Sequence, residues 1–184
     1  MALLLRAFFI LSLIAFSPTA QASKFDIMGG FFSLTAKTGQ TEGELSNLGS
    51  YRVNYLLAIH DQLEFGVGYS VAMSSVIGGD LAFGFDLGLY YFPVTSAGAY
   101  RTVSDDTKVF FQELWRPFVF GSFNQRQFQS VQSNYAGYSL GAGVERAISA
   151  SMNFKTEARV IILTGARDGE ATQIDIVAGI SLPF

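Results

Sequence analysis

The residues able to do chemistry in this sequence are few and widely spaced. His60 is the single histidine, and the chain has no cysteine. A thiol nucleophile, a disulfide framework and a cysteine-ligated metal site are therefore excluded, and one histidine alone does not make a transition-metal site. Asp61 and Glu64 follow His60 closely, but no serine is spaced two residues from it. We interpret His60 as a polar residue at the end of a turn, and we predict no catalytic residue, no enzyme activity and no cofactor.

A second set of charged residues recurs at alternate positions among glycine, alanine and serine. Alternation places these charges on one face of each strand, opposite the bulky apolar side chains. If that face points inward, the charges must be paired or neutralised. We therefore predict a buried network of salt bridges, with a gated ion or proton pathway as the alternative. Its members are Arg52, Glu64, Asp86, Glu145, Lys155, Glu157, Arg159 and Asp175, with Arg159 and Asp175 opposite each other on adjacent strands.

Strands with two chemically different faces are the elements that would position these charges. The clearest is 62–75, where Phe65, Val67 and Tyr69 alternate with Gly66, Gly68 and Ser70. The same period of two indicates strands in 50–60, 80–92, 151–163 and 172–184, and less cleanly in 25–37, 115–125 and 135–147. Most of the eight are near ten residues or longer, whereas ordinary strands average ~5–6 and a membrane-crossing strand needs ~9–11.

The two faces also indicate which side meets lipid. The polar rows are mostly Gly, Ala and Ser with a few charges, which suits the narrow interior of an eight-stranded barrel. The other rows carry Phe, Tyr, Leu, Ile and Val, which suit lipid, with aromatic residues at the interfaces. We predict an all-β fold, a closed antiparallel eight-stranded transmembrane β-barrel with up-and-down meander topology. A soluble periplasmic β-domain is the alternative.

The chain divides into a targeting segment and one domain. Residues 1–22 read as a signal peptide, with Arg6, an apolar core and a small-x-small ending; residues 23–184 form the barrel. Segments 38–50 and 125–134 are expected to be exposed polar loops. Segment 93–114 is a long connection on the short-turn, periplasmic side, with room for a small hairpin; if its arms spanned the membrane, the barrel would have ten strands. The net charge of −3 does not point to a nucleic-acid partner.

The sequence resembles the small outer-membrane barrels of the OmpA/OmpX type over nearly all of its mature part. The signal peptide, the eight amphipathic strands and the ending "IVAGISLPF" carry the resemblance. In that family the last strand ends on an aromatic residue with apolar residues at alternate positions before it. Ile180, Leu182 and Phe184 match those positions, and the resemblance implies that they form the signal read by the barrel-assembly machinery. Pro183 departs from the pattern, which is tolerable only at a strand end.

We therefore expect a porin-like outer-membrane protein of a Gram-negative cell envelope, with a structural or surface-interaction role and a lumen plugged by salt bridges. A small passive channel for small or hydrophobic solutes is the alternative. A lipid A-modifying enzyme, as some small barrels are, is a further one. The expected partners are outer-membrane lipid, lipopolysaccharide and the assembly machinery, and the barrel is expected to be a monomer.

Overall fold

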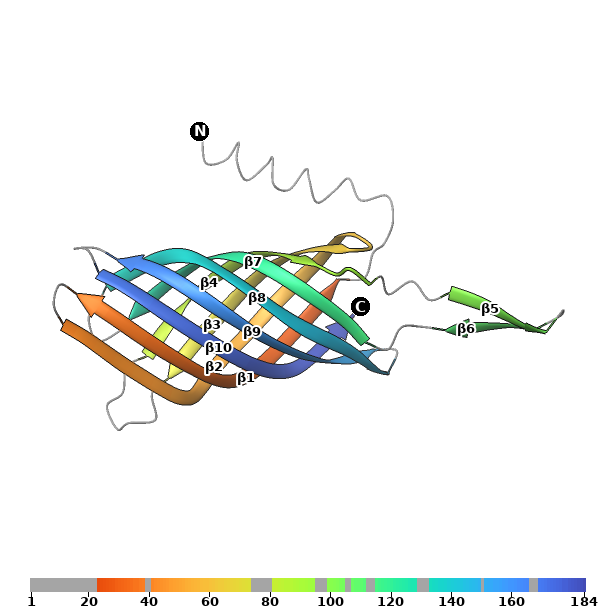
Figure 1. The fold of residues 1–184 in the computed structure, drawn as a ribbon, viewed down its shortest axis with the longest axis horizontal. Helices are drawn as coiled ribbons and strands as arrows, with labels where there is room; N and C mark the ends of the chain where they lie inside the picture. Colours follow the sequence, from red (N-terminus) through yellow and green to blue (C-terminus); the bar gives the residue numbers. More distant parts are fainter. Residues whose placement is uncertain are drawn as a thin grey trace, which may run out of the picture.

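The structure, a computed structural model, describes residues 23–38, 41–73, 81–94, 99–104, 107–111, 115–128, 133–149, 151–165 and 169–184. Eight strands form one sheet (Figure 1): β1 (Lys24–Thr38), β2 (Thr41–His60), β3 (Leu63–Met73), β4 (Leu81–Tyr91), β7 (Trp115–Phe128), β8 (Ser133–Ser149), β9 (Met152–Gly165) and β10 (Gly169–Pro183). Two more, β5 (Ala99–Ser104) and β6 (Thr107–Phe111), pair with each other as a separate sheet. No helix among the described residues has the length and hydropathy to cross a membrane.

The large sheet closes into an antiparallel barrel in the order β1-β10-β9-β8-β7-β4-β3-β2. The first and last strands form the seam, which is paired from Lys24–Pro183 to Thr38–Gly169. This confirms the closed eight-stranded meander. We call the end of the barrel that holds Lys24 and Pro183 the terminal end, and the end where Thr38 meets Thr41 the distal end.

The strand register runs around the barrel with a large stagger. A circuit of paired residues that starts at Ile27 reaches Gln125 in one direction and Trp115 in the other, ten residues apart on β7. It passes Val53, Tyr69 and Phe85 one way, and Ile180, Phe154 and Arg146 the other way. Such a stagger goes with strands tilted by ~35–45°. The tilt brings inward side chains from strands that are not neighbours to the same height across the lumen.

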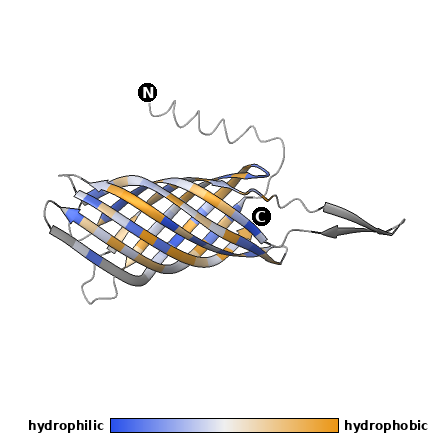
Figure 2. Ribbon diagram, viewed as in Figure 1, coloured by the Kyte–Doolittle hydropathy of each residue, from blue (hydrophilic) through white to orange (hydrophobic). Residues whose placement is uncertain are grey.

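The outer face of the barrel is apolar and the inner face is largely polar, and Figure 2 shows hydrophobic and hydrophilic residues following one another along the strands. Ile162, Ile176 and Leu89 are exposed on the outside, while charged side chains lie buried inside. The outward apolar rows run from Phe154 to Ile162 on β9 and from Ile174 to Leu182 on β10. At ~3.3 Å per residue and this tilt, such nine-residue rows cover roughly 25 Å, the height of the apolar band of outer-membrane barrels. We call this outer surface the belt.

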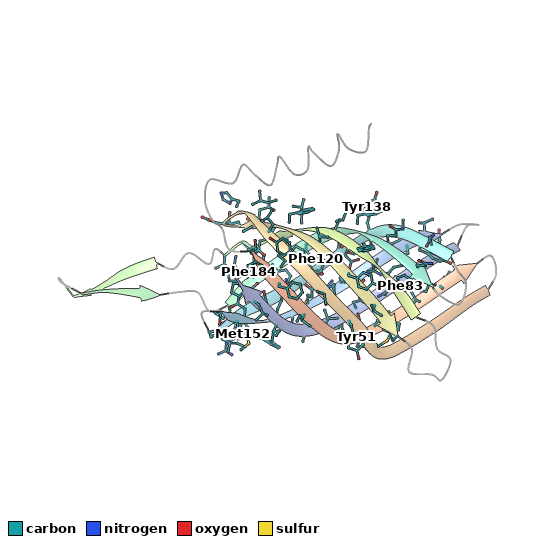
Figure 3. All side chains as sticks on the ribbon, turned by 180° about the vertical axis from the view of Figure 1, so that it is seen from behind. Tyr51, Phe83, Phe120, Tyr138, Met152 and Phe184 are labelled. Atoms are coloured by element: carbon teal, nitrogen blue, oxygen red, sulfur yellow. The ribbon has the colours of Figure 1, made fainter. Side chains whose placement is uncertain are left out.

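Aromatic side chains mark both edges of the belt. Trp115, Tyr91 and Phe184 are exposed near the terminal end, and Tyr51 and Tyr138 are exposed toward the distal end. Figure 3 shows Tyr138 pointing away from the barrel, whereas Phe120 lies inside it. Rings at both edges are typical of barrels that sit between two membrane interfaces. Together with the buried charges, they contradict the soluble β-domain.

Two of the expected loops are largely strand, whereas the expected small hairpin in 93–114 is present. Segments 38–50 and 125–134 are mostly strand, because β1 continues to Thr38, β2 begins at Thr41, and β7 extends to Phe128. The polar residues of these segments predict loops. That prediction is wrong, because a strand that extends beyond the membrane can carry polar residues on its outer face. Segment 93–114 contains the β5–β6 hairpin, outside the closed sheet and beyond the terminal end (Figure 1). Residues 1–22 lie outside the described residues.

Candidate functional site

The lumen holds equal numbers of buried acidic and basic side chains among the described residues. All are at most 7% exposed. The six basic residues are Lys24, Arg52, Arg116, Arg126, Lys155 and Arg159, and the six acidic residues are Asp26, Glu64, Asp86, Glu145, Glu157 and Asp175. A lumen lined this way has no net charge, which is what a low-dielectric interior requires of buried ions.

Four of these charges form a group at the terminal end. Lys24 Nζ lies 2.8 Å from Glu64 Oε1 and 3.0 Å from Glu145 Oε2. The Arg116 guanidinium lies 3.7 Å from Glu145 and 3.9 Å from Glu64, and stacks on the ring of Phe92, 4.2 Å from its centroid. Asn153 donates to Glu145 Oε1 at 2.6 Å. Both carboxylates are therefore shared between two cations, so no charge of this group depends on a single partner.

A single ion pair lies next to this group, surrounded by aromatic rings. Lys155 Nζ donates to Asp26 Oδ2 at 2.5 Å, and both side chains are fully buried. The ammonium lies 4.8 Å from the ring centroid of Tyr90 and 4.9 Å from that of Phe118. Ring faces attract a desolvated cation, so the rings help to hold Lys155 where water is scarce.

The middle of the lumen is occupied by a wider network centred on Arg159. Its guanidinium contacts Asp86 at 3.0 Å and Asp175 at 2.8 Å. Arg126 contacts the other oxygen of Asp86 at 2.7 Å. Side-chain amides supply further hydrogen bonds to the two carboxylates. Asn124 donates to Asp86 and Gln173 donates to Asp175, each at 2.6 Å. Arg52 pairs with Glu157 beside this network. Charged hydrogen bonds of this kind are about twice as strong as neutral ones.

Apolar clusters interrupt the polar lumen in two places. An aromatic cluster lies toward the terminal end and consists of Leu56, Tyr90, Phe92, Phe118 and Phe120. Tyr90 and Phe120 are stacked, with centroids 4.9 Å apart. The second cluster, the distal cap, lies on the distal side of Arg159 and consists of Phe32, Ala72, Ala82, Phe128, Ile161, Leu163 and Ala171. The network centred on Arg159 thus lies between two apolar clusters, and the terminal group packs on the aromatic one through Phe92.

The structure places every charge of the predicted network inside the lumen. Arg52, Glu64, Asp86, Glu145, Lys155, Glu157, Arg159 and Asp175 are all buried there, and Asp175 is paired directly opposite Arg159. Sequence reasoning missed four members: Lys24, Asp26, Arg116 and Arg126. They lie on β1 and β7, where large apolar residues face inward as well as outward, so no contrast between the rows assigned the faces. Arg116, Asn124 and Arg126 all lie in the same alternating row of β7. This clustering of polar residues in one row is the signal that could have identified Arg116 and Arg126 as inward-facing.

The three residues of the predicted assembly signal, Ile180, Leu182 and Phe184, lie at or near the outer side of the seam between β1 and β10. Ile180 faces outward within the belt, and Leu182 follows it in the same row near the terminal end. The backbone N–H of Phe184 donates to the carbonyl of Ser23 at 3.0 Å, and its ring lies 6.2 Å from that of Tyr55. Phe184 is 71% exposed. Its side chain therefore contributes little buried surface to the folded barrel.

His60 lies at the exposed end of β2, away from the lumen network. Its Nδ1 accepts a hydrogen bond from the backbone N–H of Gln62 at 3.4 Å across the turn. Among the residues that the structure describes, no group of three His, Cys, Asp or Glu side chains is arranged to hold a metal ion.

Comparison with known proteins finds similar structures but no similar sequence family. No family model matches the sequence, and no curated protein matches it at a significant level. The solved structure of Neisserial surface protein A (NspA) matches with a TM-score of 0.58 and 15% identity, over 87% of this chain and 97% of that one. OprG from Pseudomonas aeruginosa matches with a TM-score of 0.50 and 10% identity, over 89% and 97%.

The outer membrane protease OmpT from Escherichia coli also matches, with a TM-score of 0.49 and 10% identity, over 90% of this chain and 98% of that one. At identities this low, the likeness is one of fold and transfers no activity. With its outward apolar belt and closed eight-stranded sheet, the chain has the fold of the small outer-membrane β-barrel proteins.

Proposed function

We propose that the protein is a monomeric, non-catalytic outer-membrane barrel with a closed lumen and a structural or surface-interaction role. The observation that carries the proposal is the balanced charge network in the lumen, together with the aromatic cluster and the distal cap. An aqueous channel needs a continuous polar path through the barrel. Here an ion would have to pass two apolar layers and separate paired charges, each of which is costly in a low-dielectric interior.

Conductance measurements in planar lipid bilayers test the closed lumen. We expect no stepwise currents from the wild-type protein or from Glu157→Gln, since one lost charge leaves both apolar layers in place. An open porin measured in the same lipid serves as the positive control, and the heat-dependent gel shift of folded barrels shows that the inserted protein is folded. Steps of nanosiemens size from either form of the protein would contradict the proposal and support the channel alternative.

The surface role rests on the part of the wall that extends past the belt. On the distal side, Gln125, Gln127, Thr164 and Thr172 are exposed on the outer face where the apolar rows have ended. A wall of this kind presents polar side chains beyond the membrane interface. We propose that the distal end faces the cell exterior, and that lipopolysaccharide surrounds it there.

Cysteine labelling tests this orientation cleanly, because the natural chain has no cysteine. A membrane-impermeant maleimide should label Gln127→Cys in intact cells and should leave Asp61→Cys unlabelled until the outer membrane is permeabilised. Asp61 is the matched position, since it is exposed in the turn at the terminal end. The reverse labelling pattern would show that the barrel is inserted the other way.

The non-catalytic part of the proposal is tested on the lipid itself. The lone histidine lies in a turn at the terminal end, away from the buried carboxylates. We expect mass spectra of lipid A from cells with and without the protein to be the same. A changed acylation or phosphorylation pattern that His60→Ala abolishes would make the protein a lipid-modifying enzyme instead.

A further inference from the structure

A groove lies on the outer wall of the belt. It has a volume of about 510 Å³ and crosses β3, β4, β7 and β8. Its sides are the apolar residues Phe65, Leu87, Leu89, Phe123 and Leu140, with Tyr138 at one edge. This volume lies within the ~300–1,000 Å³ of sites that hold small molecules.

A glycine on the outward row of β7 opens the groove. Gly121 pairs with Leu89 on one side and Leu140 on the other, so two large side chains flank a position that has none. Val119 and Phe123 are the outward residues before and after it on β7. The floor of the groove is therefore strand backbone, and its walls are hydrocarbon.

The rim of the groove stands out from the wall. Tyr138 is 72% exposed and Leu140 is 75% exposed, the highest values among the large apolar residues of the described belt. Phe123 packs edge-on against Tyr138, with centroids 5.7 Å apart. This aromatic pair closes the distal side of the groove, and a rod-shaped apolar group would lie below it against Gly121.

We propose that this groove binds one acyl chain of a membrane lipid. The groove lies within the belt, so the surrounding medium is hydrocarbon, and apolar side chains from four strands offer contacts to a chain that lies in it. Ten residues line it, whereas a stable contact between two protein chains involves ~20–30 residues a side and ~800 Å² per partner. The groove is thus too small to be the interface with a second copy. The proposal requires only that the barrel is inserted in a bilayer, and it does not depend on whether the lumen is closed.

The direct test is to fill the groove with a side chain introduced at Gly121. A Cβ atom added at Gly121 would lie 3.5 Å from Leu140 Cδ2 and 3.7 Å from the Ser139 carbonyl oxygen, both ordinary contacts. Gly121→Leu should therefore fold and occupy the space of the lipid chain, and Gly121→Ala provides a smaller filling if the larger one fails to fold. Ala178→Leu is the matched control, because Ala178 is an exposed outward residue on β10, far from the groove.

The readout is photo-crosslinking in vesicles of phosphatidylethanolamine and phosphatidylglycerol that contain a phospholipid with a diazirine on its acyl chain. We expect the label to concentrate on Phe123, Tyr138 and Leu140 in the wild-type protein and in Ala178→Leu. Gly121→Leu should lose that label, and Gly121→Ala should reduce it. Uniform labelling around the belt, or unchanged labelling in Gly121→Leu, would overturn the proposal. A cross-linked dimer that Gly121→Leu abolishes would overturn it too, by assigning the groove to a second copy.

Discussion

Lys155 Nζ lies 2.5 Å from Asp26 Oδ2, although the two residues are 129 positions apart and sit on strands that are not neighbours in the sheet. The pair therefore spans β10, from β9 to β1. Lys24 and Glu145 do the same between β1 and β8. The charge network thus ties together strands that are not neighbours in the sheet, which backbone pairing alone does not do.

The Lys155–Asp26 pair should contribute to stability mainly through the cost of breaking it. Lys155→Met leaves Asp26 buried without a partner, which costs about 3–5 kcal/mol. The double variant Lys155→Met/Asp26→Leu should recover most of that loss, because it removes both charges. Urea unfolding in lipid vesicles, followed by the fluorescence of Trp115, the single tryptophan, measures the effect. If Lys155→Met alone unfolds at the wild-type urea concentration, the pair has no such importance.

A charge on the outside of the barrel should be as harmful as a lost charge on the inside. Val67 lies mid-way along β3 on the outward row and is 41% exposed. Val67→Arg should lower the free energy of unfolding by about 2–4 kcal/mol, the cost of an arginine at the bilayer midplane. Gln127→Arg, placed beyond the belt, should change it little. Equal stability of the two variants in vesicles would mean that Val67 does not face lipid.

Gly179 should be intolerant of a side chain because two strands meet closely at the seam. A Cβ atom there would collide with the carbonyl oxygen of Ile27 and the Cα of Met28 on β1. Gly179→Ala should therefore destabilise the barrel by about 1–3 kcal/mol, as overpacking does. Gly121→Ala is its counterpart on an open part of the wall and should be tolerated. Heat-dependent mobility on SDS gels ranks the two, and a lower transition temperature for Gly121→Ala would contradict the geometry.

Deleting Phe184 should impair insertion in cells more than it harms the folded barrel. The side chain is largely exposed, so its loss removes little buried surface. Protein refolded in detergent should keep nearly the wild-type unfolding midpoint, while the amount in the outer membrane of cells falls. Phe184→Tyr, which keeps an aromatic terminus, serves as the control. Normal outer-membrane levels of the truncated protein would refute a role of Phe184 in assembly.

The fold could be predicted because the alternation of side chains is strict on most strands. On β3 and β10 a row of bulky apolar residues faces a row of small or charged ones, so both the strand and its outward face follow from the pattern. β1 and β7 were harder, because Phe32, Phe118 and Phe120 fill the lumen and make both rows apolar. Their inward orientation depends on the size of the closed barrel, which no single strand encodes.

The partners of the buried charges could be predicted only where two strands are sequential. Arg159 and Asp175 are joined by one short connection, so their opposition follows from the hairpin. The contact of Arg159 with Asp86 crosses the lumen and depends on the stagger of the whole barrel. The groove at Gly121 depends on the exact register of neighbouring strands, which places Leu89, Gly121 and Leu140 side by side.

The seam has a consequence for how the chain enters the membrane. Lys24 and Asp26 on the first strand have their partners Glu145 and Lys155 more than 120 residues later. A partly built barrel that lacks β8 and β9 would leave Lys24 and Asp26 without these partners, and a charge that enters the membrane unpaired costs several kcal/mol. Lys24 and Asp26 are therefore neutralised only when the last strands are in place and the barrel can close. The ion pairs thus favour the closed barrel over any form that lacks its last strands.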